Sequence, residues 1–281
     1  MRPFLQTIDP NSGRQRARFR RKNALMPYSN ILLDCDGGIA TITLNRPDKL
    51  NAYTTEMGDE FTHAFRALER DASVRVVIVT GAGRAFCAGV DLEHLAAHTA
   101  GKNVSKGPQL GEEDFLRELP LEMRASSKPI IAAINGHAVG VGMTMAMPCD
   151  VRIAADDAKL GFVFGRLGIL PGLGSTHLLP QLVGMARAQE LVLTAKKILG
   201  SEAAAIGLVN KALPRDEVLP AARAMAQEMS ELDPIVLAYA KKALQFGAAH
   251  TMAEAMKNEQ SQSPRLKAAR EAAKAAKASA A

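Results

Sequence analysis

The chain has 281 residues, of which 47% are hydrophobic, and it carries 35 basic residues, 29 acidic residues and three cysteines. This length suits one large domain or two small ones, with enough apolar residues for a core. No apolar run reaches about 18 residues, which excludes a membrane-spanning helix. The sparse, odd cysteine set is typical of a reducing cytosol rather than of a disulfide scaffold, and we therefore expect a cytoplasmic protein.

The positive charge is confined to a leader, residues 1–25. It holds six arginines and one lysine against a single acid, which leaves 28 of the 35 basic and 28 of the 29 acidic residues for the rest of the chain. A neutral body argues against nucleic-acid binding. The leader has no apolar segment of the kind found in secretory signals. We predict that it is disordered or that Met26 is the true first residue, with an organelle transit peptide as a further alternative.

The first half of the chain alternates between strands and helices. Residues 31–34 and 39–44 are rich in β-branched residues and flank Asp36-Gly37-Gly38, a pattern that predicts a hairpin. Apolar residues then recur at helical spacing from 57 to 68, and the continuous apolar run 74–80 predicts a strand buried on both faces. We expect next a glycine-rich turn (81–89), a helix (91–98), a loop (99–112) and another helix (115–123).

Residues 128–150 form the stretch around which the rest of the chain is organised. An apolar run (130–134) predicts a buried strand, a glycine-rich turn follows at 135–142, and residues 143–147 are apolar on every side, as in a buried helix. The start of such a helix has unpaired N–H groups that favour negative charge. Because glycine lets a ligand oxygen approach the backbone closely, we predict an anion or oxyanion site here.

The second half of the chain becomes increasingly helical. Its first predicted elements are a strand (151–154), an apolar segment (160–164) and a further glycine-rich turn (168–174). Helices (176–183 and 186–193), a last strand (207–212) and two longer helices (218–232 and 234–246) follow. From residue 266 the sequence predicts an Ala/Lys/Arg-rich surface or interface helix.

Several familiar motifs fail on inspection. Gly81-Ala82-Gly83 and Gly140-Val141-Gly142 both lack the third glycine of a dinucleotide-binding fingerprint, and the chain has neither a P-loop nor a nucleophile elbow. His94 and His98 are one helical turn apart but have no evident third metal ligand. For His137 and Asp91 we favour structural roles, a hydrogen bond to nearby backbone and a helix cap respectively.

Four ordered motifs resemble the crotonase (enoyl-CoA hydratase/isomerase) superfamily over residues 30–260. They are Arg46-Pro47…Asn51-Ala52, then Gly81…Phe86-Cys87-Ala88-Gly89-Val90-Asp91-Leu92, then Lys128-Pro129…Asn135-Gly136…Gly140-Val141-Gly142…Cys149-Asp150, then Leu167-Gly168-Ile169-Leu170-Pro171-Gly172…Gly174-Ser175-Thr176…Leu179-Pro180…Val183-Gly184.

The resemblance implies an α/β fold. It consists of a spiral of strand–strand–helix units in residues 26–200 and a C-terminal helical trimerisation region in residues 201–281. It also implies a homotrimer or hexamer, an acyl-CoA thioester as substrate, and no metal or further cofactor, because coenzyme A belongs to the substrate. Four motifs in order identify the superfamily but not the reaction.

The resemblance also assigns site residues. The amides of Val90 and Val141 become the two donors of an oxyanion hole, in which each donor typically contributes about 3–4 kcal/mol to the transition state. Coenzyme A follows the backbone of Lys49 and Leu50 and the segment 90–93, which has Glu93 where the family often has a lysine. The remaining substrate contacts are assigned to Ala52, Ala88, Asp91, Leu92, Gly140, Thr144, Phe164 and Gly172.

The sequence departs from the family at its acids. Thr144 and Phe164 occupy the two hydratase glutamate positions, and Gly172 occupies the position of an acid in some isomerases. An enzyme that uses isomerisation, decarboxylation or hydrolysis, and a non-catalytic acyl-CoA-binding protein, are the two hypotheses that follow. The first needs an acid or base from elsewhere, and the candidates are Glu93, His94, Glu113, Asp114, Glu118, Glu122 and His137.

Overall fold

The computed structural model describes residues 28–102 and 108–279. The basic leader and the middle of the expected loop 99–112 therefore lie outside the described residues. The helices are η1 (Pro47–Lys49), α1 (Thr55–Arg70), α2 (Leu92–Thr99), α3 (Asp114–Arg117), α4 (Leu119–Ala125), α5 (Val141–Ala146), η2 (Val163–Leu167), α6 (Ser175–Val183), α7 (Met185–Leu193), α8 (Gly200–Ala205), α9 (Arg215–Glu231), α10 (Pro234–Gly247) and α11 (Met252–Ser279).

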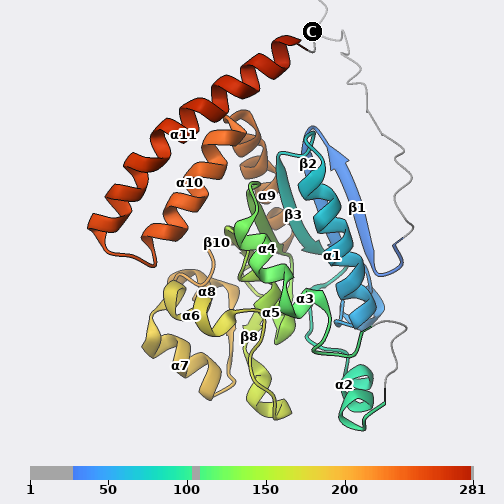
Figure 1. The fold of residues 1–281 in the computed structure, drawn as a ribbon. Coiled ribbons are helices and arrows are strands. Elements are labelled where there is room, and N and C mark those ends of the chain that lie inside the picture. The colour runs from blue at the N-terminus through green and yellow to red at the C-terminus, as the bar shows by residue number, and fades with distance from the viewer. Residues whose placement is uncertain (1–27, 103–107, 280–281) are drawn as a thin grey trace, which may run out of the picture.

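Two sheets form the centre of the molecule (Figure 1). The larger has the order β1-β2-β3-β5-β7-β10 and the smaller the order β4-β6-β8-β9. All pairs are parallel except β1 with β2 and β8 with β9. The large sheet contains β1 (Ile31–Asp36), β2 (Ile39–Leu44), β3 (Val76–Gly81), β5 (Ile130–Ile134), β7 (Val151–Ala155) and β10 (Lys211–Leu213), and the small one β4 (Ala85–Cys87), β6 (His137–Val139), β8 (Lys159–Gly161) and β9 (Lys197–Leu199).

The chain passes through both sheets once per turn of a spiral. β3, β5 and β7 enter the large sheet, β4, β6 and β8 follow in the small sheet, and a helix comes after each of these pairs. Every residue of β3 and β5 is buried, as expected for parallel strands covered on both faces. The predicted α/β spiral of strand–strand–helix units is therefore confirmed.

Short strands account for most differences from the predicted elements. β4 and β6 lie inside segments that the sequence indicates as glycine-rich turns, because three residues are too few to show a period. The last strand begins at Lys211 instead of residue 207. Gly207 has a φ of +79°, which suits a turn, and the carbonyl of Leu208 accepts a hydrogen bond from the Arg152 side chain.

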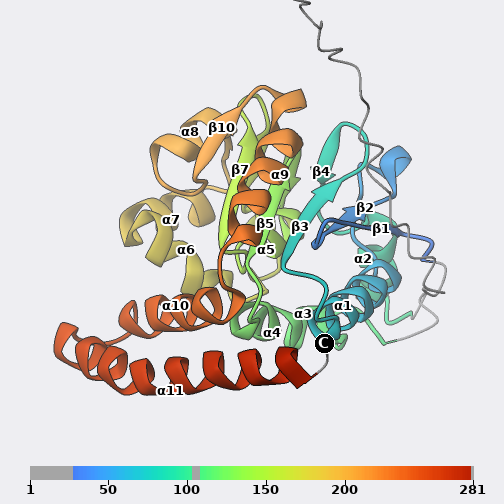
Figure 2. The ribbon, with the colours of Figure 1, turned by 90° about the horizontal axis from the view of Figure 1, so that it is seen from above.

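The three C-terminal helices divide into one that covers the core and two that leave it. α9 lies across the large sheet and buries Val218, Ala222 and Ala226 (Figure 2). The sheet therefore covers the apolar face of α9 within the single chain. β10 is a strand of the large sheet and α9 packs against that sheet, although both follow residue 200. α10 and α11 lie side by side and extend from the body (Figure 1).

A partly buried ion pair anchors α10 to the sheets. The Nζ of Lys241 lies 2.8 Å from Oδ2 of Asp150 and donates to the carbonyls of Met123 and Lys128 at 3.2 Å each. α11 begins at Met252, well before residue 266, with Thr251 and Glu254 bonded reciprocally as a capping box. Within the described residues, none of the helices has both the length and the apolar character that crossing a membrane requires.

Candidate active site

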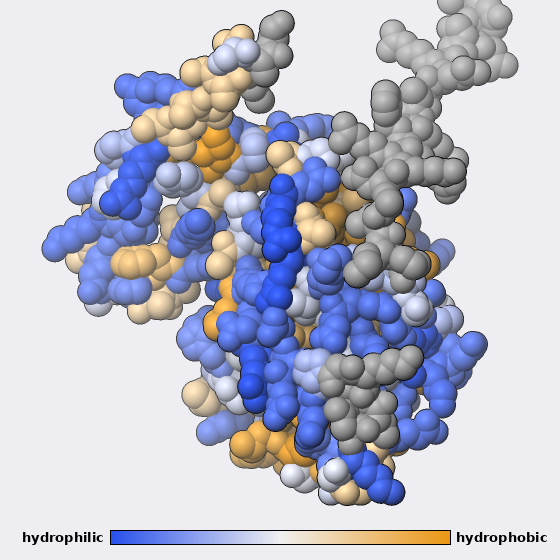
Figure 3. All heavy atoms as spheres, turned by 45° about the vertical axis from the view of Figure 1, so that its right-hand side comes forward, coloured by the Kyte–Doolittle hydropathy of each residue, from blue (hydrophilic) through white to orange (hydrophobic). Residues whose placement is uncertain are grey.

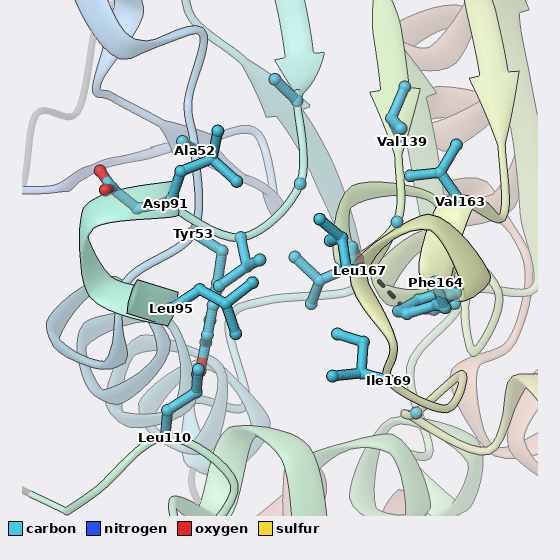
Figure 4. A pocket seen from close by; sticks show the side chains of 18 of the residues that line it. Ala52, Tyr53, Asp91, Leu95, Leu110, Val139, Val163, Phe164, Leu167 and Ile169 are labelled. Atoms are coloured by element: carbon cyan, nitrogen blue, oxygen red, sulfur yellow. Dashed lines mark hydrogen bonds between the residues drawn. The ribbon is translucent and has the colours of Figure 1, made fainter. Parts of the chain in front are cut away.

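A largely apolar cavity of about 530 Å³ lies at the glycine-rich turns 81–89 and 135–142, the second and third turns (Figure 4). Tyr53, Leu95 and Leu110 stand on one side, and Phe164 and Ile169 face them across the space. Eleven of the twelve residues predicted for the site line this cavity: Lys49, Ala52, Ala88, Val90, Asp91, Leu92, Gly140, Val141, Thr144, Phe164 and Gly172.

Leu50 is the exception: it does not line the cavity, and its contact with coenzyme A, which the resemblance assigns to its backbone, stays a prediction. It occupies a left-handed conformation with a φ of +51°, and its carbonyl accepts the N–H of Ala88 at 3.0 Å. The residue therefore supports the second glycine-rich turn from behind. Its backbone position keeps it next to Lys49, which does line the cavity.

A buried network explains why Arg46, Asn51 and Asp91 occur together in the sequence. The fully buried Asn51 amide donates to the carbonyls of Ala82 and Ala85 at 2.9 and 2.8 Å, and its Oδ1 accepts the N–H of Arg46 at 2.8 Å. The Arg46 guanidinium bonds to the carbonyl of Ala52 and lies 3.0 Å from Oδ2 of Asp91. These bonds tie the segment 46–53 to the turn at 81–91.

Asp91 caps α2, as the sequence predicts, because its Oδ1 accepts the N–H groups of Glu93 and His94. Burial alone would raise the pKa of this carboxyl. The hydrogen bonds from Arg46 and from the helix N–H groups, together with the Arg46 charge, outweigh burial and hold the pKa below its ordinary value. Asp91 is therefore a fixed anion that orients the turn.

The second and third turns meet backbone to backbone. A Cβ atom on Gly142 would lie 2.2 Å from the carbonyl oxygen of Cys87, and one on Gly89 would lie 3.2 Å from that of Val139. Only glycine allows this approach. The contact brings the two turns onto the same cavity.

At least one backbone amide at each turn has no partner in the described part of the chain. Ala88 and Asp91 donate their N–H groups to the carbonyls of Leu50 and Tyr53, whereas no hydrogen bond from the Val90 N–H occurs. The Val141 N–H, at the start of α5, is likewise unbonded. Both residues line the cavity.

The three expected acid positions lie at the cavity without an acid. Thr144 is fully buried, and its hydroxyl donates to the carbonyl of Val141 at 3.3 Å. Phe164 is 6% exposed and forms part of the wall, and Gly172 contributes only backbone. None of these residues can hold or release a proton at neutral pH.

The seven alternative acid or base candidates have scattered positions. Glu93 lines the cavity, but its side chain is 86% exposed and lies 3.8 Å from Lys49. Glu113 is fully buried beside the cavity, where its carboxylate accepts the hydroxyl of Tyr53. His137 accepts the backbone N–H of Lys159, so the favoured structural role is confirmed. The others lie outside the lining: His94 contacts Thr55, Asp114 and Glu122 pair with Arg66, and Glu118 is exposed.

Sequence reasoning missed Tyr53 and most of the apolar wall. Tyr53 directly follows the Asn51-Ala52 motif, and its position was the available signal. The wall residues come from four separate segments, and no local pattern links them: Leu95, Leu110, Leu116, Val139, Val163, Leu167, Ile169, Leu170 and Leu173.

Several lining residues also reach the surface. Leu170 is 88% exposed and Leu92 is 66% exposed. α2 and the segment after η2 lie at the lower end of the molecule in Figure 1, and Figure 3 shows hydrophobic surface at that end. The cavity therefore opens to solvent beside an apolar rim.

Comparison with known proteins gives one consistent family. Residues 34–278 match the family described as enoyl-CoA hydratase/isomerase. A probable enoyl-CoA hydratase of Mycobacterium leprae is 36% identical over 83% of this chain and 88% of its own length. The 1,2-epoxyphenylacetyl-CoA isomerase of Escherichia coli is 34% identical over 79% and 84%. A putative enoyl-CoA hydratase from Thermobifida fusca, solved in complex with CoA, superposes with a TM-score of 0.74 at 30% identity, covering 88% of this chain and 94% of that one.

Proposed function

The chain belongs to the enoyl-CoA hydratase/isomerase family, and from that premise we propose that it forms the enolate of an acyl-CoA thioester. The amides of Val90 and Val141 are the proposed donors to the thioester oxygen. Preorganised backbone donors of this kind stabilise charge that develops in the transition state and need no reorganisation to do so. The observation that carries the proposal is that these two unpaired amides line one apolar cavity.

We further propose that the reaction is isomerisation, decarboxylation or hydrolysis rather than hydration. Hydration needs one group to activate water and one to protonate carbon, and the buried Thr144 and Phe164 supply neither. Isomerisation moves a proton within the substrate, and decarboxylation releases carbon dioxide to leave the same enolate. Both demand less from the protein's own acids.

The coenzyme A portion of the substrate is proposed to enter along Lys49 and the segment 90–93. Lys49 and Glu93 stand together at the cavity with exposed side chains, 57% and 86% exposed respectively. A CoA phosphate would compete with Glu93 for the lysine. The substrate brings coenzyme A itself, so we propose no separate cofactor.

We propose that α10 and α11 assemble the chain into a trimer or hexamer in the cytoplasm. No residue of α10 is buried within the single chain, and Leu244, Leu232 and Val236 are 76%, 54% and 37% exposed. Patches of this kind mark association surfaces. Light scattering at micromolar concentration should give three or six times the 30.0 kDa chain mass, and a monomer would contradict this.

The test of the function joins binding to turnover. Calorimetry with butyryl-CoA should show binding, while steady-state hydration of crotonyl-CoA should fall below ordinary hydratase rates by about 10²-fold or more for each missing group. Ordinary hydration rates would show that another carboxylate serves the site. Binding without turnover of any acyl-CoA in a panel would favour a non-catalytic acyl-CoA-binding protein, and absence of binding would overturn the proposal.

A further inference from the structure

The two proposed oxyanion donors hold charge but move no proton, so the cavity needs another group for proton transfer. Of the described residues that line it, Lys49, Tyr53, Asp91, Glu93 and Lys197 are ionisable. Lys49, Glu93 and Lys197 are exposed. Asp91 is held by Arg46 and by α2. Tyr53, at 1% exposed, is the buried lining residue that can still exchange a proton.

Tyr53 is bonded to a buried carboxylate. Its hydroxyl donates to Oε1 of Glu113 at 2.6 Å, and the N–H of Gly111 donates to Oε2 at 2.6 Å. Glu113 is fully buried, and within the described ranges no cation lies within ion-pair distance of it. A buried carboxylate that is hydrogen-bonded to a side chain of the cavity wall is a candidate for function.

The packing around the pair fixes the phenol in place. The Tyr53 ring stacks on Phe115 with centroids 4.7 Å apart. On α1, a Cβ atom at Gly58 would lie 2.4 Å from the Tyr53 oxygen, so glycine at this position makes room for the hydroxyl. Burial, and then the Glu113 charge, raise the pKa of Tyr53 well above its ordinary value. The phenol therefore stays protonated at rest.

The backbone contacts of Tyr53 fix how far its hydroxyl lies from the Val90 amide. Tyr53 and Val90 form a parallel bridge, in which the Tyr53 N–H donates to the carbonyl of Gly89 at 2.8 Å. The side chain then runs along the wall toward Leu110 (Figure 4). Its oxygen is thus a full side chain's length from the strand that presents the Val90 amide. The phenol is therefore offset along the wall from the Val90 amide, and it is at this offset that the proposal below places the γ-carbon.

We propose that Tyr53, backed by Glu113, transfers protons between the γ- and α-carbons of an enoyl thioester, so that the cavity interconverts 2-enoyl-CoA and 3-enoyl-CoA. This inference rests on the proposed function. Tyr53 touches the substrate and is the catalytic residue, and Glu113 positions it and receives its proton.

The step balances without water or any co-reactant. The γ-carbon gives its proton to the Tyr53 oxygen while Tyr53 passes its own proton to Oε1 of Glu113. The C–H electron pair forms the β,γ double bond, the former α,β pair moves to the bond between the α-carbon and the carbonyl carbon, and the thioester oxygen takes the charge beside Val90 and Val141. The proton then returns from Tyr53 to the α-carbon as Glu113 gives its proton back.

The first experiment uses the wild-type protein. 2-Hexenoyl-CoA that carries deuterium at the γ-carbon is incubated with the protein in ordinary water, and deuterium is located by nuclear magnetic resonance. Formation of 3-hexenoyl-CoA with deuterium moved from the γ- to the α-carbon (γ-exchange) is the expected result. Binding of the thioester without γ-exchange would overturn the role of Tyr53 while leaving the enolate proposal intact. Failure to bind any acyl-CoA would overturn the proposed function itself.

The second experiment uses Tyr53→Phe and Glu113→Gln. Each should lower γ-exchange by about 10²-fold or more, while the dissociation constant for saturated hexanoyl-CoA stays within about twofold of wild type. Because the two residues act as a unit, the double variant should be no slower than the slower single variant. Tyr28→Phe removes a phenol that bonds His63 at 2.8 Å on the surface and should change nothing.

A purely structural pair would give a different pattern. Both variants would then melt earlier and bind hexanoyl-CoA more weakly, but the exchange rate at saturating substrate would remain that of wild type. That result overturns the proposal. If Tyr53→Phe fails to fold, Glu113→Gln and the position of deuterium in the wild-type experiment still decide it.

Discussion

The backbone amides of Val90 and Val141 and the side chains of Thr144 and Phe164 line one cavity, but the fold constrains them differently. The amides are placed by close backbone contacts at glycines and by the buried Arg46 network. At Gly142, for example, an added Cβ atom would lie only 2.2 Å from the Cys87 carbonyl oxygen. Nothing comparable requires a carboxylate at 144 or 164, where a small hydroxyl and a ring fill the space. Backbone donors therefore persist when side chains change, and the acid–base chemistry depends on side chains alone.

The largest expected effect comes from breaking the backbone contact. Gly142→Ala places a Cβ atom 2.2 Å from the Cys87 carbonyl oxygen, so one of the two turns must move. The free energy of unfolding should fall by about 3 kcal/mol or more, and calorimetric binding of butyryl-CoA should be lost.

The matched control is Gly165→Ala, where an added Cβ meets no atom within 4 Å. This variant should melt and bind like wild type. Equal behaviour of the two variants would show that the turns are not held by glycine contact.

The next largest effect is expected from the side chains at positions 144 and 164. Thr144→Glu with Phe164→Glu restores both hydratase acids and should raise crotonyl-CoA hydration by about 10²-fold or more over wild type. Burying two carboxylates costs stability because both positions are at most 6% exposed, so rates are compared at a temperature where circular dichroism shows folded protein.

Thr144→Gln with Phe164→Gln has the same shape without the acids and should gain no hydration. A folded glutamate variant that also gains none would mean that the amides are not positioned as an oxyanion hole.

A smaller effect concerns the network behind the second turn. Arg46→Met removes the partner of Asp91 and should lower the free energy of unfolding by about 2 kcal/mol at neutral pH. Because the folded pKa of Asp91 is lowered, its stabilisation is present above the ordinary carboxyl pKa and is lost as pH falls toward the folded value. The gap between wild type and variant, measured by denaturant titration, should therefore narrow in acid.

Arg215→Met provides the comparison on the surface. Its guanidinium lies 3.3 Å from Asp157, but the two side chains are 38% and 64% exposed, so a loss of about 0–1 kcal/mol is expected. A gap for Arg46→Met that stays constant from neutral to acid pH would show that the Asp91 pair is not its source.

The smallest effect is expected at the rim. Leu170 lines the cavity yet is 88% exposed, so Leu170→Ala should change the free energy of unfolding by no more than about 0.5 kcal/mol. Calorimetry with butyryl-CoA should likewise show little change. A large loss of affinity would mean that this rim closes over the substrate.

The sequence allowed us to predict the elements that show a continuous or periodic apolar pattern and those that contain a recognisable motif. Buried parallel strands such as β3 and β5 appear as continuous apolar runs, and Gly140-Val141-Gly142 marks a turn by composition alone. Three-residue strands carry no period, which is why β4 and β6 were missed. The Tyr53–Glu113 bond joins residues sixty positions apart, and such a pair arises from the packing of α1 against α3, which no local pattern contains.

The spiral allows the helical connections between its strand pairs, the limbs, to differ in length. The chain leaves β4, β6 and β8 of the small sheet for limbs of different length: two short helices and α2 in the first, α5 alone in the second, and η2, α6 and α7 in the third. The first two limbs nevertheless return to adjacent strands of the large sheet. Insertions and deletions in these limbs would resize the cavity without shifting the strands after which Val90 and Val141 follow. Divergence among duplicated genes of this fold can therefore proceed by loop length, with the thioester end inherited unchanged.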